Sequence, residues 1–313
     1  MKKIWLIGTG LMAREYAKVL KDLQVEPIVI GRGKENSELF EKETGYKPYV
    51  GGIESFLYTK PPTPDAAIVA VGVEALSSTT HALLNYGVKK ILVEKPGVGY
   101  AAELDELVKN IEEKQATVFL AYNRRFYSSV KKAKELIQED GGVTSFHFEF
   151  TEWSHTIKDL PKHPTEHQNW FLGNSTHVID MAFFLGGTPT DICCFISGSL
   201  PWHSKSSVFT GAGKTNQNAL FSYCANWESP GRWSVEILTK KHRFIFKPLE
   251  TLQVQEIGSI AINPILLDDE LDKKYKPGVY LQTKCFLEDQ FSELCSIDQQ
   301  KKNITIYKKM SNY

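Results

Sequence analysis

Between residues 3 and 121, short apolar runs alternate with segments of helical periodicity. The runs are Lys3–Ile7, Pro27–Ile30, Ala66–Val71, Lys90–Val93 and Thr117–Ala121. Apolar residues between Met12 and Leu20 recur at helical spacing, as they do between Leu104 and Ile111. Continuous apolar strands that are each followed by a helix are typical of a parallel sheet covered by helices on both faces. The sequence therefore predicts a doubly wound α/β domain over residues 1–121.

After Tyr122 the pattern changes. One helical segment near Val130–Gln138 is followed by Phe146, Phe148 and Phe150, which alternate with polar residues and predict a strand with one solvated face. Further strand-like runs, with few helices between them, are Asp191–Ile196, Ala219–Tyr223, Trp233–Thr239, Arg243–Phe246 and Thr251–Gln255. We expect residues 122–313 to form an α+β substrate-binding domain with an open, largely antiparallel sheet.

Length and composition narrow the class of protein. A chain of 313 residues is long enough for two domains with separate cores. Lys+Arg and Asp+Glu both total 37, so no overall charge favours nucleic acid or a membrane surface as a partner. The five cysteines form no C-x-x-C pair, and the first apolar run is too short for an export signal. We expect a cytoplasmic protein with reduced thiols and no structural metal.

A glycine-rich string lies at the junction of the first strand and the first helix. It reads Gly8-Thr9-Gly10-Leu11-Met12-Ala13, which is G-x-G-x-x-A. The first glycine of such a loop permits a tight turn, the second lets the backbone approach a pyrophosphate, and the helix N-terminus receives the anion. A turn that binds nothing is the alternative. The position of the string within a βαβ unit favours a dinucleotide-binding Rossmann domain.

The end of the second strand bears on the choice of cofactor. A site that prefers NAD(H) places Asp or Glu there, whereas this sequence reads Ile30-Gly31-Arg32-Gly33-Lys34. Arg32 can pair with a 2′-phosphate, so NADP(H) is favoured over NAD(H); a solvent-exposed arginine is the alternative. The string Gly211–Thr215 imitates a phosphate-binding loop, but Val208 stands where its first glycine should be, and we expect a surface turn there.

Glu94-Lys95-Pro96 follows directly on an apolar strand. Ligands of doubly wound sheets bind at the carboxyl ends of the strands, and a partly desolvated lysine placed there can exchange a proton with a substrate hydroxyl. Position alone fits a surface lysine equally well.

Four motifs together resemble the Gfo/Idh/MocA family, named for glucose-fructose oxidoreductase, inositol dehydrogenase and rhizopine catabolism. They are the glycine-rich string, Glu94-Lys95-Pro96, Tyr122-Asn123-Arg124-Arg125-Phe126 and His177-Val-Ile-Asp180. The resemblance implies that Lys95 is the active-site lysine and that Glu94 and Lys95 lie near the nicotinamide. It implies further that His177 is the acid/base and Asp180 its accompanying acid, although a histidine on an apolar helix is also a common structural residue.

The sequence departs from the family pattern near His177 and after the fourth strand. Gly173 stands where an acidic residue is usual, so a third catalytic carboxylate is in question there, and Asn174 or Tyr122 is expected to orient the substrate instead. Val71-Gly72-Val73 replaces the usual Pro-Asn, and Ser77 occupies the usual histidine position. We therefore expect cofactor contacts at Val71 to come from the backbone.

Several residues are candidates for binding the substrate. Arg124 and Arg125 can recognise a carboxylate or phosphate, or can brace the two domains. Trp153 and Trp170 stand at the two ends of a segment that contains several histidines, and either tryptophan can stack on a sugar face. The histidines of this segment lack the spacing of a metal site. The leading hypothesis is hydride transfer between a nicotinamide cofactor and a hydroxyl or keto carbon of a sugar, sugar phosphate or nucleotide sugar. A non-catalytic NADP(H)-binding sensor or structural subunit is the alternative, and the open sheet favours a homo-oligomer.

Overall fold

The computed structural model describes residues 2–311 and divides into two compact units. The first holds residues up to 123 together with 274–302, and the second holds residues 124–273 together with those from 303 onward. Residues 274–302, which the sequence analysis placed in the second domain, thus lie in the first unit. The pairing of a short C-terminal strand with the parallel sheet explains this difference.

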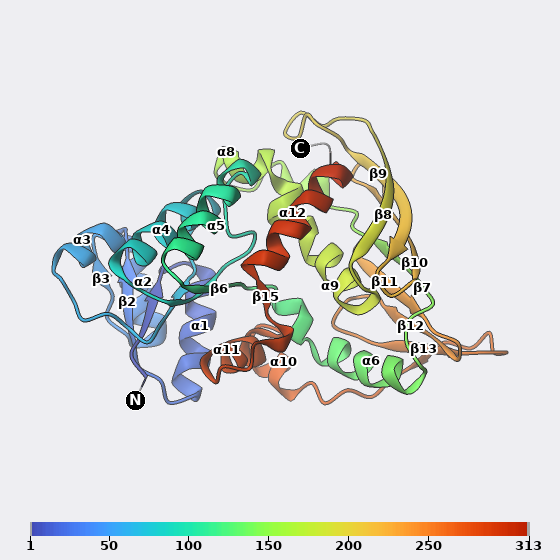
Figure 1. Ribbon diagram of the computed structural model, residues 1–313, viewed down its shortest axis with the longest axis horizontal. Coiled ribbons are helices and arrows are strands. Elements are labelled where there is room, and N and C mark those ends of the chain that lie inside the picture. Colours follow the sequence, from blue (N-terminus) through green and yellow to red (C-terminus); the bar gives the residue numbers. More distant parts are fainter. Residues whose placement is uncertain (1, 312–313) are drawn as a thin grey trace. The chain divides into compact units, whose positions relative to one another are not determined.

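The first unit is built on a seven-stranded sheet in the order β15-β6-β5-β4-β1-β2-β3. Its strands are β1 (Ile4–Ile7), β2 (Pro27–Gly31), β3 (Tyr49–Val50), β4 (Ala66–Val69), β5 (Lys90–Val93), β6 (Thr117–Leu120) and β15 (Cys295–Ser296). All neighbours pair in parallel except β15, which lies antiparallel to β6 with Cys295 opposite Leu120. The doubly wound α/β domain is confirmed, and β3 and β15 are added to it (Figure 1).

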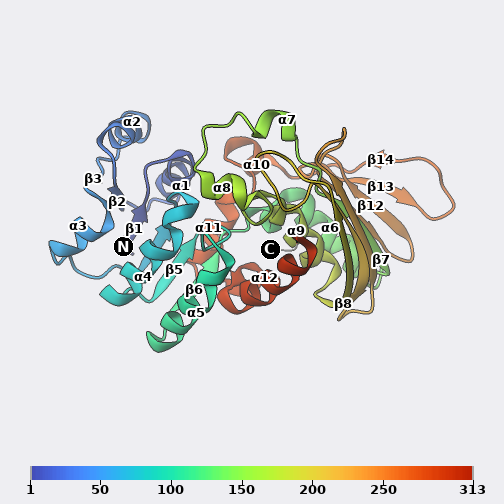
Figure 2. The same ribbon diagram turned by 90° about the horizontal axis from the view of Figure 1, so that it is seen from above.

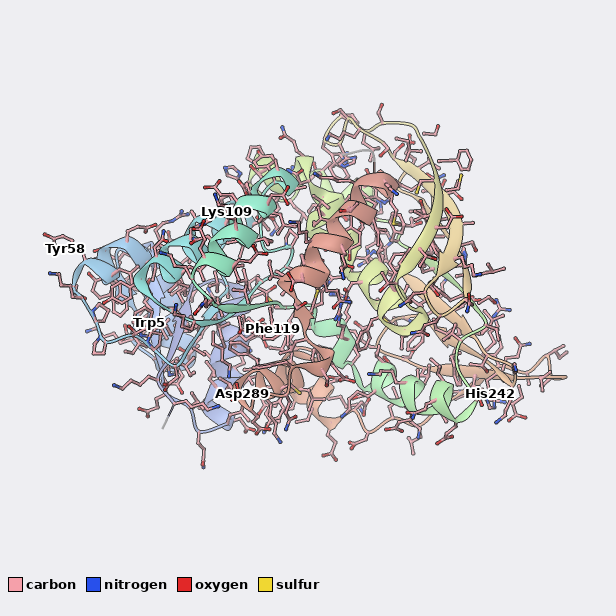
Figure 3. The ribbon with its side chains drawn as sticks, viewed as in Figure 1. Trp5, Tyr58, Lys109, Phe119, His242 and Asp289 are labelled. Carbon is pink, nitrogen blue, oxygen red and sulfur yellow. The ribbon has the colours of Figure 1, made fainter. Side chains whose placement is uncertain are left out.

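Helices cover both faces of this sheet. They are α1 (Leu11–Asp22), α2 (Lys34–Thr44), α3 (Gly52–Tyr58), α4 (Leu76–Tyr86), α5 (Leu104–Glu113) and α11 (Val279–Leu287). Figure 2 shows α1 and α2 on one side of the strands and α4 and α5 on the other. Short 3₁₀ turns lie at η1 (Val73–Ala75), η2 (Ala101–Glu103) and η5 (Phe291–Glu293). Trp5 of β1 is buried in the core, whereas Tyr58 at the end of α3 points outward (Figure 3).

The second unit is built on an eight-stranded sheet in the order β14-β13-β12-β11-β7-β10-β9-β8. Its strands are β7 (Ser145–Glu149), β8 (Pro189–Ser197), β9 (Val208–Thr215), β10 (Leu220–Asn226), β11 (Ser234–Leu238), β12 (His242–Phe246), β13 (Gln253–Glu256) and β14 (Asn263–Pro264). The sheet is antiparallel except where β7 runs parallel to β10. On β7, Phe146 and Phe148 are buried and pack on Phe183 of the covering helix α9 (Thr176–Gly186), which confirms the expected one-sided strand.

The expected turn at Gly211–Thr215 is wrong, because these residues form the second half of β9. Both neighbouring strands explain why glycine is needed there. A Cβ on Gly211 would lie 2.5 Å from the carbonyl oxygen of Cys193 and 2.6 Å from the ring of Tyr223, and a Cβ on Gly213 would lie 2.1 Å from the carbonyl oxygen of Asp191 and 2.7 Å from the ring of Phe221. The backbone of β8 and the aromatic rings of β10 therefore occupy the space that side chains would need on β9. The glycines are spaced for packing, and the resemblance to a phosphate loop is accidental.

The second unit also holds more helix than its sequence pattern indicates. Its helical segments are η3 (Asn123–Phe126), α6 (Ser128–Glu139), α7 (Ser154–Ile157), α8 (Pro164–Gln168), the π-helix η4 (Phe171–Ser175), α9 and α10 (Glu270–Lys274). The division between the units falls within η3, α10 and the last helix, α12 (Ile297–Ser311). Among residues 2–311, no helix is long and apolar enough to cross a membrane.

Candidate functional site

The glycine-rich loop joins β1 to α1 with the geometry that an anion site needs. Gly8 has φ +120°, and a Cβ there would lie 2.2 Å from the carbonyl oxygen of Ala70, so only glycine fits. Gly10 is the N-cap of α1, and a Cβ at this position would meet nothing within 4 Å. The first turn of α1 carries no acidic residue, and no side chain caps it. Its N–H groups and positive dipole end are therefore suited to a pyrophosphate.

The other expected cofactor positions lie at the carboxyl ends of the neighbouring strands. Arg32 directly follows β2 and is exposed, and Val71 follows β4 and is partly exposed. Thr9 is buried in the loop, while Leu11 is 77% exposed. These residues come from three adjacent strands of the first unit, β4-β1-β2. The edge matches the place where doubly wound folds bind nucleotides.

Glu94, which follows β5 and is partly buried, is held by a chain of hydrogen bonds. The hydroxyl of Tyr16 donates to Oε1 of Glu94 at 2.7 Å, and Nε2 of Gln282 donates to the Tyr16 oxygen at 3.1 Å. Burial raises the pKa of Glu94, although Tyr16 and the positive charges of Lys95 and Lys276 act in the opposite direction. Lys95 itself is partly exposed. The Glu-Lys-Pro segment thus combines a fixed, desolvated carboxyl with an adjacent amine.

The C-terminal part of the first unit supplies two supports for this segment that sequence reasoning missed. Gln282 of α11 and Gln300 of α12 are both fully buried. Nε2 of Gln300 donates to the carbonyl oxygen of Pro96 at 3.0 Å. Neither glutamine belongs to a recognisable motif, and each lies more than 180 residues along the chain from its partner, so no local signal could have identified them.

In the second unit, Arg125 and Asp180 bind each other. The guanidinium donates from Nε to Oδ2 at 2.8 Å and from Nη2 to Oδ1 at 2.6 Å, and both residues are 2% exposed. Such a bidentate pair satisfies the carboxylate and fixes α9 against the start of the unit. His177, one turn earlier on α9, is 8% exposed and lies 6.3 Å from the Trp233 ring, centroid to centroid.

A buried carboxyl that the sequence did not single out lies close to the position where the family pattern expects one. Glu152 follows β7 and is 1% exposed. Nδ2 of Asn174 donates to its carboxylate at 3.0 Å, and Oγ of Ser175 donates at 2.8 Å. Burial raises the pKa of Glu152 to about 7, against the lowering effect of these hydrogen bonds and of Arg232. Glu152 therefore supplies the acid that Gly173 lacks. It comes from the segment after β7 and contacts Ser175, two residues before His177.

The remaining substrate candidates differ in exposure. Trp153 is 48% exposed and donates from Nε1 to the carbonyl oxygen of Gly231 at 3.0 Å. Trp170 is 9% exposed and packs edge-on against Trp202, so it is not placed to stack on a sugar. Tyr122 is 1% exposed. Of the three aromatic candidates, Trp153 alone presents a large free surface.

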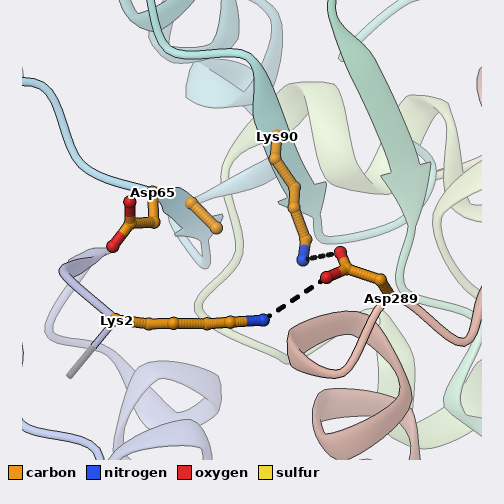
Figure 4. Close-up of a pocket in the computed structure, with 5 residues that line it drawn as sticks. Lys2, Asp65, Lys90 and Asp289 are labelled. Carbon is orange, nitrogen blue, oxygen red and sulfur yellow. Dashed lines mark hydrogen bonds and ion pairs between the residues drawn. The ribbon is translucent and has the colours of Figure 1, made fainter.

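A pocket of about 430 Å³ lies at the opposite edge of the parallel sheet (Figure 4). It is lined by Lys2, Asp65, Ala66, Lys90 and Asp289. Both lysines form ion pairs with Asp289, and these residues stand at the amino ends of strands or between helices. The charges compensate one another, and the edge is the wrong one for a nucleotide. We regard this pocket as a surface ion network.

Within residues 2–311, no group of three or more His, Cys, Asp or Glu side chains is arranged to hold a metal ion.

Comparisons with known proteins agree with this geometry. Residues 2–122 match the family model of the Gfo/Idh/MocA oxidoreductases, described as an oxidoreductase family with an NAD-binding Rossmann fold. The family resemblance is thereby confirmed, and the chain carries the NAD-binding domain of these nicotinamide-dependent oxidoreductases. No curated protein matches the sequence.

Solved structures share the fold over nearly the whole chain. Levoglucosan dehydrogenase in complex with NADH has a TM-score of 0.80 at 16% identity, with 99% of this chain and 96% of that chain covered. UDP-N-acetylglucosamine 3-dehydrogenase from Acidithiobacillus ferrooxidans has a TM-score of 0.75 at 13% identity, with 99% and 97% covered. An oxidoreductase from Agrobacterium radiobacter in complex with NAD+, L-tartaric acid and magnesium has a TM-score of 0.76 at 15% identity, with 98% and 94% covered. At these identities the likeness concerns the fold.

Proposed function

We propose that the protein transfers a hydride between NADP(H) and a hydroxyl or keto carbon of a sugar, sugar phosphate or nucleotide sugar. The observation that carries this proposal is the position of Glu94 and Lys95 on the strand edge that also bears the loop of Gly8 and Gly10. Two structural neighbours, levoglucosan dehydrogenase and UDP-N-acetylglucosamine 3-dehydrogenase, act on sugars, which supports the substrate class.

The chain's own residues supply binding and proton transfer. When bound, the nicotinamide supplies the hydride acceptor or donor. Lys95 or His177 takes the proton of the substrate hydroxyl during oxidation and returns it during ketone reduction. The partly buried carboxyl of Glu94, fixed by Tyr16, orients the adjacent lysine and its charge. Gly8, Gly10 and the N-terminus of α1 receive the pyrophosphate.

Three expected roles are refined by the contacts in the second unit. Because Asp180 and Arg125 satisfy each other, we assign both to positioning α9 and His177 rather than to proton transfer or substrate binding. Asn174 gives its amide hydrogens to Glu152, which leaves its carbonyl oxygen as the group that orients a substrate hydroxyl. Trp153 remains the candidate for stacking on the sugar.

A screen for absorbance change near 340 nm, with both cofactors and a panel of cyclitols, sugars, sugar phosphates and nucleotide sugars, tests the proposal. Removing an acid/base group costs about 10²- to 10⁴-fold in rate, and we expect losses in this range for Lys95→Ala and His177→Ala. Lys89→Ala, an exposed lysine before β5, and His147→Ala, on the outer face of β7, are matched controls. Turnover that survives both active-site substitutions refutes the mechanism. Cofactor binding without turnover of any substrate favours the sensor instead.

The preference for NADP(H) is tested separately. Loss of a charge-assisted contact to the 2′-phosphate in Arg32→Ala should raise the NADP(H) KM about 10- to 100-fold and leave the NAD(H) KM nearly unchanged. Lys34→Ala, an exposed cation two residues away, is the control for a general loss of charge. An unchanged NADP(H) KM in Arg32→Ala would contradict the assignment.

Self-association and a cytoplasmic location stay predictions, which light scattering and cell fractionation can check.

A further inference from the structure

Arg124 is a cation whose attracting carboxylates, Glu250 and Glu152, form no close ion pair with it. It is partly buried, and its Nε has no hydrogen-bond partner among residues 2–311. Its Nε is buried, and the guanidinium lies 4.8 Å from the ring centroid of Trp233 and 5.9 Å from that of Tyr127. Burial lowers the pKa of Arg124. The Nε–H of Arg124 is therefore a buried donor without an acceptor, and an anion that accepts from the guanidinium would complete the site.

A second guanidinium lies beside the first. Arg232 is 4.5 Å from the Trp233 ring and 4.7 Å from the Trp153 ring. Its positive charge contributes to the lowered pKa of Arg124, which shows that the two cations are close enough to repel. Gly231, the residue before Arg232, packs closely on the end of β7, because a Cβ there would lie 2.3 Å from the carboxylate of Glu149 and 3.0 Å from the side chain of Thr151.

One buried carboxyl faces these two cations. We call the group of Arg124, Arg232, Trp153, Trp233 and Glu152 the arginine cluster. Nη1 of Arg232 is 3.6 Å from Oε2 of Glu152, which is a loose pair compared with Arg125 and Asp180. Glu250 attracts Arg124 but is exposed and forms no ion pair with it. Even with Glu152 ionised, the cluster keeps an excess of positive charge in a partly buried setting, since Arg232 is 43% exposed.

We propose that the arginine cluster binds an acidic group of the substrate, a carboxylate or a phosphate, so that the protein acts on an acidic sugar derivative. The planar fork of arginine suits both kinds of group, and Trp153 offers a partly exposed ring beside it for a sugar face. The Trp233 ring of the cluster lies 6.3 Å from His177, which brings the bound acid next to the residue proposed for proton transfer. This inference rests on the proposed oxidoreductase function for the identity of the ligand as a substrate.

The test measures binding and turnover in parallel on the full chain. The probes are glucose, glucuronate, glucose 6-phosphate and UDP-glucose, titrated by calorimetry and assayed at 340 nm with both cofactors. The variants are Arg124→Gln, Arg232→Gln and Arg124→Lys, with Arg243→Gln as the control because Arg243 is an exposed arginine of β12 that pairs with Glu236. Melting temperatures establish that each variant is folded.

We expect at least one acidic probe to bind about tenfold or more tightly than glucose, since a charge-assisted bidentate contact is worth more than a tenfold change in affinity. Arg124→Gln and Arg232→Gln should remove that preference, Arg124→Lys should keep part of it, and Arg243→Gln should keep all of it. Preference for glucuronate indicates a carboxylate, and preference for either phosphate ester indicates a phosphate.

The failures of the two proposals are distinguishable. If glucose binds as well as every acidic probe, or if both glutamine variants keep the preference, the anion site is overturned even when turnover is seen. If acids bind in an Arg124-dependent way but no probe changes the absorbance, the anion site stands and the proposed oxidoreductase activity is the part that fails. Should Arg124→Gln not fold, Arg232→Gln gives the same decision.

Discussion

Arg124 and Arg125 are neighbours in the chain, and the second unit treats their charges in opposite ways. Around Arg125 the region is closed: one carboxylate, that of Asp180, accepts two hydrogen bonds, and neither side chain reaches solvent. Around Arg124 the region is open: the guanidinium lies beside an aromatic ring and forms no close ion pair, and a second cation, Arg232, increases the positive charge. Two identical residues in one motif therefore have different tasks.

The difference teaches how a charge is used after it is buried. A bidentate pair is satisfied within the protein, so it restricts α9 to one position and has little left for a ligand. An unpaired guanidinium contributes nothing comparable to stability, but it is preorganised for an anion that arrives from outside. We therefore assign the Arg125–Asp180 pair, the closed region, to the framework of the unit, and the surroundings of Arg124, the open region, to the binding site. Three substitutions test this assignment.

The largest effect should follow from opening the closed region. Asp180→Ala leaves the guanidinium of Arg125 buried without its carboxylate, and breaking a buried ion pair in this way costs about 3–5 kcal/mol of unfolding free energy. Urea unfolding followed by fluorescence measures this cost. Asp191→Ala, which removes an exposed acid from β8, is the matched control and should change little. Equal losses in the two variants would mean that the Arg125–Asp180 pair does not hold the unit together.

A smaller, pH-dependent effect is expected from Glu152. Its pKa in the folded protein is raised from the ordinary value of 4.5 to about 7, so the folded state binds more protons than the unfolded state between these values. The stabilisation is fully present below about pH 4.5 and is lost as pH rises through 7, by up to roughly 3 kcal/mol at 1.36 kcal/mol per pKa unit. Unfolding free energies measured from pH 5 to pH 8 should therefore fall in the wild type and be flatter in Glu152→Gln.

Glu149→Gln, at the end of the strand that precedes Glu152, is the control for a lost carboxylate in the same part of the chain. It should keep the wild-type slope. If Glu152→Gln also keeps the wild-type slope of unfolding free energy against pH, the pKa of Glu152 is not raised in the folded protein. Glu152 is then ionised at neutral pH and neutralises more of the charge of the two arginines than its contacts indicate.

The parts of the fold that could be predicted from the sequence are those whose signals are local. Apolar runs separated by helical segments predicted β1, β2, β4, β5 and β6. The glycine-rich string predicted the tight turn at Gly8 between β1 and α1. The strand β15 has two residues and no apolar run, so its pairing with β6 is visible only in three dimensions. The glycines of β9 led to a wrong prediction for the same reason, because the groups that require them belong to the neighbouring strands β8 and β10.

The candidate site divides along similar lines. Lys95 and His177 could be proposed from the sequence because each belongs to a short string of characteristic residues. Glu152 was missed because its partners Asn174 and Ser175 lie more than twenty residues away, and no spacing rule connects them. Whether an arginine is paired also depends on distant residues, so the string Asn123-Arg124-Arg125-Phe126 gave no reason to separate Arg124 from Arg125.

The smallest effect on stability should come from the open region, and it is the sharpest test of the comparison. Arg124→Gln removes a desolvated charge that has no partner, which relieves its burial cost and its repulsion from Arg232 but loses packing on Trp233. These contributions oppose each other, so the unfolding free energy should stay within about 1 kcal/mol of the wild type. Arg125→Gln, measured beside it, should lose several times as much because Asp180 then stays buried and unpaired. Comparable losses for the two neighbours would show that Arg124 has a counter-ion in solution, and the distinction between a framework charge and a ligand-binding charge would then fail.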